Sequence, residues 1–289
     1  MEYFLLLTLS ALATAKVSVQ SSASRRILKG HKDVVFFNAG VFMVVAVLFL
    51  YKIIGCSPSV WIFAVAFAFF TVAFQLFYTE ALSIGNVSLT VMTINLSMIM
   101  PLLVSYFYYN EKLSTYRIIG IILTIAAIIC VTDVKSGNKT NKKWLIFTVL
   151  AALSNGATGI TQKIFNASIY AVEREAFISS SYILAFCLTL VIYLVICLSN
   201  KKKEVEKTAK INAKIFIYIA LVGGILAVFQ WINNYALTII DGTFFFPVYS
   251  GGSIILSSLV GVLIFKDKLT KKQLIGIILG VVSIVLMNF

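Results

Sequence analysis

The chain has 289 residues, of which 60% are hydrophobic and 12% are charged, and its mean hydropathy is +0.99. Soluble domains carry roughly 25% charged residues, so this composition supplies too little polar surface for a water-exposed globule. It predicts an integral membrane protein and excludes disordered chains, collagen-like fibres and disulfide scaffolds. The net charge of +13 is read as a signal of membrane topology and requires no nucleic-acid partner.

Ten apolar runs are each long enough to cross a bilayer as a helix. A hydrocarbon core of about 30 Å requires roughly 20 helical residues, whereas barrel strands would alternate polar and apolar side chains. Residues 39–51 are continuously apolar, which favours helices. We therefore predict an all-α membrane protein with ten transmembrane helices. The runs cover residues 3–21, 34–53, 60–82, 87–108, 115–132, 144–163, 176–198, 213–239, 244–265 and 272–288.

The first 15 residues allow a second interpretation. An apolar stretch at residues 4–12 is followed by Ala13, Thr14 and Ala15, which is similar to a secretory signal with its cleavage site. The residues before the apolar stretch include Glu2 but no Lys or Arg. A signal normally begins with basic residues, so we expect this stretch to remain as the first span.

Lys and Arg concentrate in alternate connectors between the spans. Cytoplasmic loops of membrane proteins carry the excess of these residues. We therefore predict a multi-pass protein of the cell membrane in which both termini and the connector at Glu111 face away from the cytoplasm. The basic connectors lie around residues 25–32, 135–143, 201–214 and 266–272.

The second half of the chain repeats the first. The segment Tyr-Asn-Glu-Lys-Leu-Ser at 109–114 corresponds to Phe-Lys-Asp-Lys-Leu-Thr at 265–270, and each precedes an Ile-Gly-Ile-Ile-Leu segment. We predict a first five-helix repeat at residues 1–133, a cytoplasmic linker at 134–143 and a second five-helix repeat at 144–289. Because five is odd, the second repeat enters the membrane from the opposite face. Such inverted repeats are typical of carriers that work by alternating access.

These features resemble the drug/metabolite transporter superfamily, and within it the ten-helix EamA-type carriers. The two acidic-Lys-Leu-Ser/Thr turns are the most specific part of the resemblance, and Pro101 in the fourth span adds to it. The equivalent of Pro101 in the second half is Ser257, which departs from the pattern. The resemblance implies a secondary carrier of amino acids, metabolites, nucleotide sugars or drugs, with a central cavity lined by spans 1, 3, 4, 6, 8 and 9.

Polar residues inside the spans are the candidates for such a cavity, because a polar group hidden from lipid needs a partner, a cavity or the interface. Gln75 and Gln230 occupy equivalent places in the two repeats, and they are either cavity residues or interhelical hydrogen-bonding groups. The ammonium of Lys16 either faces the cavity or snorkels to the interface. The predicted cavity residues are Lys16, Gln75, Tyr78, Asn95, Asn155, Gln230, Asn234 and Tyr249.

Glu80 is the candidate for coupling transport to protons. It is a carboxylate near the predicted cytoplasmic end of the third span, and a proton-linked carrier needs a side chain that binds and releases a proton. The alternative is that Glu80 is only a solvated helix end.

The remaining motifs predict no cofactor and no metal. His31 is the only histidine, the four cysteines have no paired spacing, and no phosphate-binding loop is present. Gly276 and Gly280 form a GxxxG pattern that permits either internal helix packing or a weak homodimer beside the monomer. The expected partners are therefore the lipid bilayer, a small-molecule substrate and, in proton-linked transport, protons. The alternative to a transporter is a non-transporting membrane protein, either an intramembrane enzyme or an assembly partner.

Overall fold

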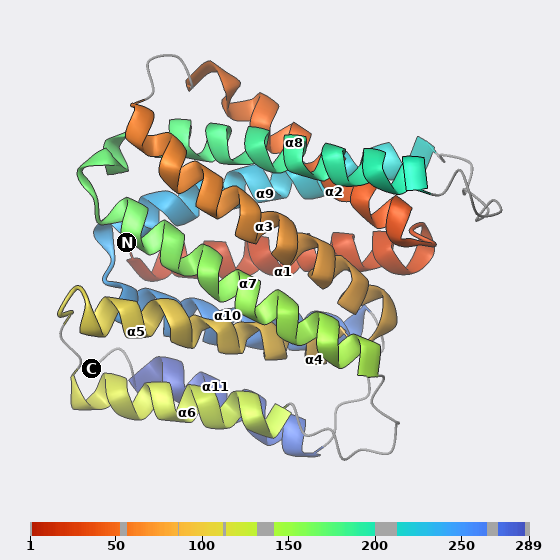
Figure 1. Cartoon of the computed structure of the whole chain (residues 1–289). Coiled ribbons are helices and arrows are strands. Elements are labelled where there is room, and N and C mark those ends of the chain that lie inside the picture. The colour runs from red at the N-terminus through yellow and green to blue at the C-terminus, as the bar shows by residue number, and fades with distance from the viewer. Residues whose placement is uncertain are drawn as a thin grey trace.

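The structure is a computed structural model, and it describes residues 2–52, 57–85, 87–111, 114–131, 142–199, 213–264 and 271–286 (Figure 1). The regular elements within these residues are all helices. The first half of the chain contains α1 (Glu2–Arg26), α2 (His31–Phe49), η1 (Leu50–Lys52), α3 (Pro58–Ile84), α4 (Val87–Asn95), η2 (Leu96–Met98), α5 (Ile99–Phe107) and α6 (Thr115–Val131). The second contains α7 (Lys142–Asn166), η3 (Ile169–Glu173), α8 (Arg174–Ser199), α9 (Ala213–Ile239), α10 (Gly242–Leu263) and α11 (Lys271–Leu286).

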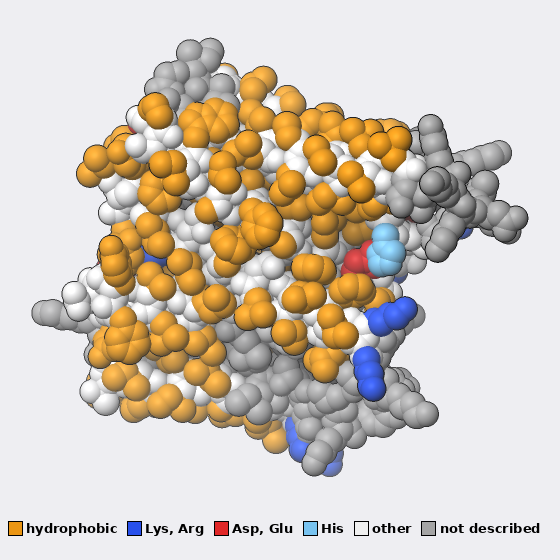
Figure 2. Space-filling model, in the orientation of Figure 1, with side chains coloured by type: hydrophobic (Ala, Val, Ile, Leu, Met, Phe, Trp, Pro, Cys, Tyr) orange, Lys and Arg blue, Asp and Glu red, His pale blue; other side chains and the backbone are white. Residues whose placement is uncertain are grey.

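Seven helices of the described chain are long and apolar enough to cross a membrane: α1, α2, α3, α7, α8, α9 and α10. The other three predicted spans correspond to shorter pieces, namely α4 to α5, α6 and α11. Large apolar side chains such as Phe69, Leu194 and Ile217 are exposed, and apolar side chains cover most of the face seen in Figure 2. A surface of this kind suits contact with lipid tails. The protein is therefore an all-helical, multi-pass membrane protein.

The fourth predicted span is not one continuous helix. The sequence predicted a single run over residues 87–108, but the structure divides it into α4, the 3₁₀ segment η2 and α5. Pro101 lies just after η2 and has no N–H to give to the carbonyl of Ser97, four residues earlier. The chain tightens into a 3₁₀ turn at this place, and Ser97 and Met98 of this turn line the cavity described below.

The helices lie side by side along the bundle, and α1, α2 and α3 run in alternating directions (Figure 1). We call the end of the bundle that holds the α5–α6 connection the Glu111 end, and the opposite end the basic end (Figure 1). Most of the Lys and Arg side chains visible in Figure 2 gather at the basic end, where the sole histidine also lies. The helix α1 begins and α11 ends at the Glu111 end (Figure 1). The start of α1 and the end of α11 therefore lie on the same side of the bundle as the α5–α6 connection.

The first helix is an integral part of the bundle. It packs against α9 and α10, and Leu6 and Leu9 are fully buried in these contacts. The Ser10 hydroxyl donates to the carbonyl of Tyr249 on α10 over 3.3 Å. Residues 2–26 thus form one helix of the folded bundle, and it is long and apolar enough to be the first predicted span.

Candidate functional site

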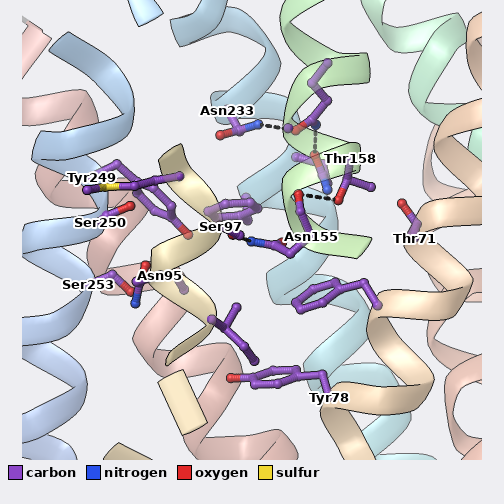
Figure 3. A pocket seen from close by; sticks show the side chains of 18 of the residues that line it. Thr71, Tyr78, Asn95, Ser97, Asn155, Thr158, Asn233, Tyr249, Ser250 and Ser253 are labelled. Atoms are coloured by element: carbon purple, nitrogen blue, oxygen red, sulfur yellow. Dashed lines mark hydrogen bonds between the residues drawn. The ribbon is translucent and has the colours of Figure 1, made fainter. Parts of the chain in front are cut away.

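A cavity of about 160 Å³ lies in the centre of the bundle (Figure 3). Residues of α1, α3, α7, α8, α9 and α10 and of the segment from α4 to α5 surround it. Its wall alternates amide and hydroxyl groups with aromatic rings, and Lys16 is the one charged side chain among the lining residues of the described chain. The polar lining residues are Lys16, Thr71, Gln75, Tyr78, Asn95, Ser97, Asn155, Thr158, Gln162, Tyr182, Gln230, Asn233, Tyr249, Ser250 and Ser253.

The structure brings seven of the eight predicted cavity residues to this wall. They are Lys16, Gln75, Tyr78, Asn95, Asn155, Gln230 and Tyr249. Asn234 is the exception, because its side chain is fully buried and its carbonyl oxygen accepts a hydrogen bond from Asn166 over 2.9 Å. The neighbouring Asn233 lines the cavity instead.

Several aromatic wall residues had no place among the predicted cavity residues. Phe74, Tyr182, Phe229 and Phe245 all line the cavity. Aromatic side chains are equally common in apolar spans that face lipid or pack in a core, so type and spacing do not distinguish these positions. The phenol of Tyr182 accepts a hydrogen bond from the Gln230 amide over 2.9 Å.

The Lys16 side chain lies beside two aromatic rings of α3. Its ammonium nitrogen is 5.7 Å from the centre of the Phe74 ring and 6.0 Å from the centre of the Tyr78 ring, within the range of a cation–π contact. Phe74 and Tyr78 are themselves stacked, with centroids 5.2 Å apart. Of the two interpretations of Lys16, the structure therefore favours the one in which the ammonium faces the cavity.

Gln75 belongs to a hydrogen-bond network within the first half of the chain. The Gln20 amide on α1 donates to the Gln75 carbonyl over 3.4 Å and to the Thr79 hydroxyl over 2.8 Å. The Asn38 amide on α2 also reaches the Thr79 hydroxyl, over 3.1 Å. The network thus joins α1, α2 and α3 beside the cavity, with Gln75 at its edge.

Gln230 belongs to a second network, within the second half of the chain. The Gln162 amide on α7 donates to the Gln230 carbonyl over 2.7 Å, and the Gln230 amide donates to Tyr182 on α8. The Asn233 amide donates to the Gln162 carbonyl over 3.2 Å, and Asn166 donates to Asn234. This network joins α7, α8 and α9. Gln75 and Gln230 are therefore wall residues and interhelical hydrogen-bonding groups at the same time.

Glu80 lies outside the cavity wall. Its carboxylate is 2.6 Å from Nδ1 of His31 at the start of α2. The Glu80 side chain is 15% exposed and the His31 side chain 73% exposed. The structure thus gives Glu80 a partner at the basic end of the bundle, and that partner is the sole histidine of the sequence.

A buried ion pair at the Glu111 end is the main feature that the sequence analysis missed. The Lys163 ammonium on α7 pairs with the Glu111 carboxylate that follows α5, and the other Glu111 oxygen accepts from the backbone N–H of Thr243 over 2.9 Å. The two side chains are only 7% and 11% exposed. The sequence analysis ended the sixth span at residue 163, whereas α7 continues to Asn166, so Lys163 lies within the helix.

Tyr109 completes this group at the Glu111 end. The Lys163 ammonium lies 5.5 Å from the centre of its ring. Burial, together with Tyr108 and the Glu111 carboxylate, raises the pKa of Tyr109 above its ordinary value. The phenol therefore stays neutral at physiological pH, and Glu111 is the only anionic member of the group. The Lys112 and Leu113 part of this turn, the second turn at 265–270 and most of the predicted linker lie outside the described residues.

Comparisons with known proteins agree with the fold. The model of the EamA-like transporter family matches residues 3–133 and 142–289. One crystal structure of a protein has a TM-score of 0.70 to this chain at 13% sequence identity, over 97% of this chain and 95% of its own; at that identity the likeness shows the fold alone. No curated protein matches the sequence significantly. The family match covers nearly the whole chain, and the protein is therefore a member of the EamA-like transporter family of membrane transporters.

Proposed function

We propose that the protein is a secondary active transporter that carries a small organic solute by alternating access around the central cavity. The observation that carries the proposal is the cavity itself, whose wall comes from both repeats and combines hydrogen-bonding groups with aromatic rings. Its volume of about 160 Å³ is similar to that of an engineered cavity that holds benzene, roughly 150 Å³. Pockets for drug-sized ligands have roughly 300–1,000 Å³. An amino acid or another small metabolite therefore fits this conformation better than a drug does.

The proposal includes ten spans arranged as two inverted repeats. The two hydrogen-bond networks support it, because α1, α2 and α3 provide one of them and α7, α8 and α9 provide the other. Helix packing supports it as well. In the proposed repeats α3 corresponds to α9 and α2 to α8, so the α3–α8 contact has the α9–α2 contact as its counterpart. Both contacts are extensive.

The two ends of α7 suggest how access alternates. At the basic end, the Trp144 indole donates to the Thr90 hydroxyl on α4 over 2.9 Å and packs against Gly85 after α3. At the other end, Lys163 pairs with Glu111. Both contacts join the second repeat to the first. We propose that one contact separates while the other holds, so that the cavity opens to one side at a time.

Solute counterflow in proteoliposomes tests the proposed function. Vesicles loaded with one unlabelled solute from a panel of amino acids and small metabolites are expected to accumulate its labelled form, because counterflow needs no added driving force. Protein-free vesicles are the control. Absence of counterflow for every solute would contradict the proposal and favour a non-transporting membrane protein.

The predicted orientation gives a separate test. Single cysteines at positions 108 and 202, in a background without the native cysteines, are exposed to an impermeant thiol reagent in intact cells. Position 108 is used because Tyr108 is exposed at the end of α5, whereas Glu111 is buried in its ion pair. We expect labelling at 108 but not at 202, because the basic connectors should be cytoplasmic. Labelling at 202 but not at 108 would reverse the topology and would place both termini inside.

Proton coupling is proposed to use Glu80 together with His31. An exposed imidazole in hydrogen-bond contact with a carboxylate can pass a proton from water to a span that also provides Gln75 and Tyr78 to the cavity wall. Glu80→Gln is expected to keep solute exchange, which moves no net proton, and to lose uphill transport driven by a pH gradient. The measurement is accumulation in proteoliposomes with and without an imposed gradient.

His31→Gln is the companion variant and should show the same separation of exchange from uphill transport. Asp33→Asn, a nearby change of one carboxylate at the start of α2, is the matched control. Retained gradient-driven accumulation in Glu80→Gln would show that the pair is only a contact between helix ends.

A further inference from the structure

The cavity contains a cation whose charge no described protein group balances. Lys16 is the charged residue of the described wall, and it takes part in none of the ion pairs found in the described chain. The described carboxylates with known contacts are occupied elsewhere. Glu80 contacts His31, Glu111 contacts Lys163, Asp33 accepts from the backbone of Lys29, Glu173 accepts from Ser57, and Glu175 accepts from Trp231.

The partners that Lys16 does have are aromatic. The rings of Phe74 and Tyr78 attract the ammonium through their faces, but a ring face offers no lone pair to the three N–H donors of a lysine. A charged group held inside a membrane-spanning bundle normally has an ionic or hydrogen-bonding partner. The Lys16 ammonium therefore has no anionic partner among the described residues, and the open space beside it is the cavity.

The rest of the wall suits the remainder of a small solute. Amides and hydroxyls from Asn95, Asn155, Ser250 and Ser253 can donate and accept hydrogen bonds without adding charge. Phe74, Phe229 and Phe245 supply apolar surface for a hydrocarbon body. A cationic solute would meet the Lys16 ammonium and find no carboxylate in the described wall. The wall therefore disfavours cationic solutes and accepts anionic ones.

We infer that Lys16 binds the anionic oxygens of the solute, and that the transported solute is a small organic anion of the carboxylate class. Transport of this anion rests on the proposed function, whereas its binding at Lys16 does not depend on it. The Lys16 ammonium provides the charge-assisted hydrogen bonds, the neutral polar groups fix the orientation of the solute, and the rings enclose its apolar part.

Size-matched ligands that differ only in charge test the inference. The purified full chain is heated with benzoate, benzamide or benzylammonium, and in parallel with butyrate, butyramide or butylammonium, at constant ionic strength. A ligand that binds only the folded protein raises its unfolding temperature with concentration. We expect each carboxylate to bind more than about tenfold more tightly than its amide. The amide leaves the Lys16 ammonium without an anionic partner, and an unpaired buried charge is costly. The ammonium compounds are expected to cause no rise.

Variants at position 16 identify the group responsible. Lys16→Met keeps the length of the side chain without its charge and is expected to reduce carboxylate binding to the level of the amide. Lys16→Arg keeps the charge and should retain a preference for the carboxylate. Lys29→Met removes the same charge from an exposed position after α1 and should leave binding unchanged, which controls for the net charge of the protein.

Equal binding of carboxylate and amide would overturn the inference, and so would carboxylate binding that survives in Lys16→Met. A panel in which no carboxylate binds counts against it in the same way. The test also separates this inference from the proposed function. Counterflow of neutral solutes alone, unchanged in Lys16→Met, would overturn anion binding and keep the transporter, whereas charge-selective binding without any flux would keep anion binding and overturn transport.

Discussion

Replacing Glu111 with Gln, or Lys163 with Met, is expected to lower the free energy of unfolding by about 3–5 kcal/mol, the usual cost of breaking a buried ion pair by removing one partner. Each change leaves the opposite charge in a site where the two side chains are only 11% and 7% exposed. Glu111→Gln also weakens the acceptor for the Thr243 N–H at the start of α10. Denaturant titration of the purified protein in mixed micelles measures the effect.

The double variant Glu111→Gln with Lys163→Met removes both charges together. Its loss of stability should be much smaller than the sum of the two single losses, because no unpaired charge remains. Glu2→Gln is the control, since Glu2 is an exposed carboxylate at the start of α1, at the same end of the bundle. Single variants within about 0.5 kcal/mol of the wild type, as is usual for surface substitutions, would mean that water reaches the pair and that it does not close this end.

The positions of the long helices could be predicted because the bilayer sets their length. The predicted runs at 60–82 and 213–239 differ from α3 and α9 by at most two residues at either end. The break in the fourth span was missed, although its cause, Pro101, is visible in the sequence. A run of apolar residues shows that a segment can cross the membrane, but it does not show where the backbone hydrogen bonds are interrupted.

The cavity wall could be predicted to the level of a helix face and no further. Gln230, Asn233 and Asn234 lie three and four residues apart and share one face of α9. In the structure that face meets two environments, so Gln230 and Asn233 line the cavity while Asn234 turns to Asn166 on α7. Which environment a residue meets depends on the neighbouring helix, and periodicity within one helix does not contain that information.

The pair of Lys163 and Glu111 shows the same limit for charges. In sequence both residues look like members of short connectors, where charges are solvated and count only toward topology. Their contact depends on α7 running one turn further than its apolar run and on the α5–α6 turn folding over its end. A lysine next to an amide-rich helix face, here Gln162 and Asn166, was the one local signal that Lys163 belongs to the bundle.

Filling the cavity should abolish transport while the bundle stays folded. Ala13 on α1 lines the cavity, and Ala13→Trp would place an indole into a space of about 160 Å³. We expect counterflow to fall to the level of protein-free vesicles, because the indole occupies the volume that the solute needs. Overpacking of a closed core costs about 1–3 kcal/mol, and an open cavity should reduce that cost, so the free energy of unfolding should change little.

Ala15→Trp is the matched control for this blockade. Ala15 lies two residues further along the same helix and is exposed, so its indole should point to lipid and leave transport intact. A readout that needs no solute is also available, since a cysteine in place of Ser253, on the cavity wall contributed by α10, can be labelled with a small neutral thiol reagent. The label should react far more slowly when Ala13→Trp is present and at an unchanged rate when Ala15→Trp is present. If Ala13→Trp leaves both the labelling rate and the counterflow of a folded protein unchanged, the solute passes elsewhere and the central cavity is not the transport site.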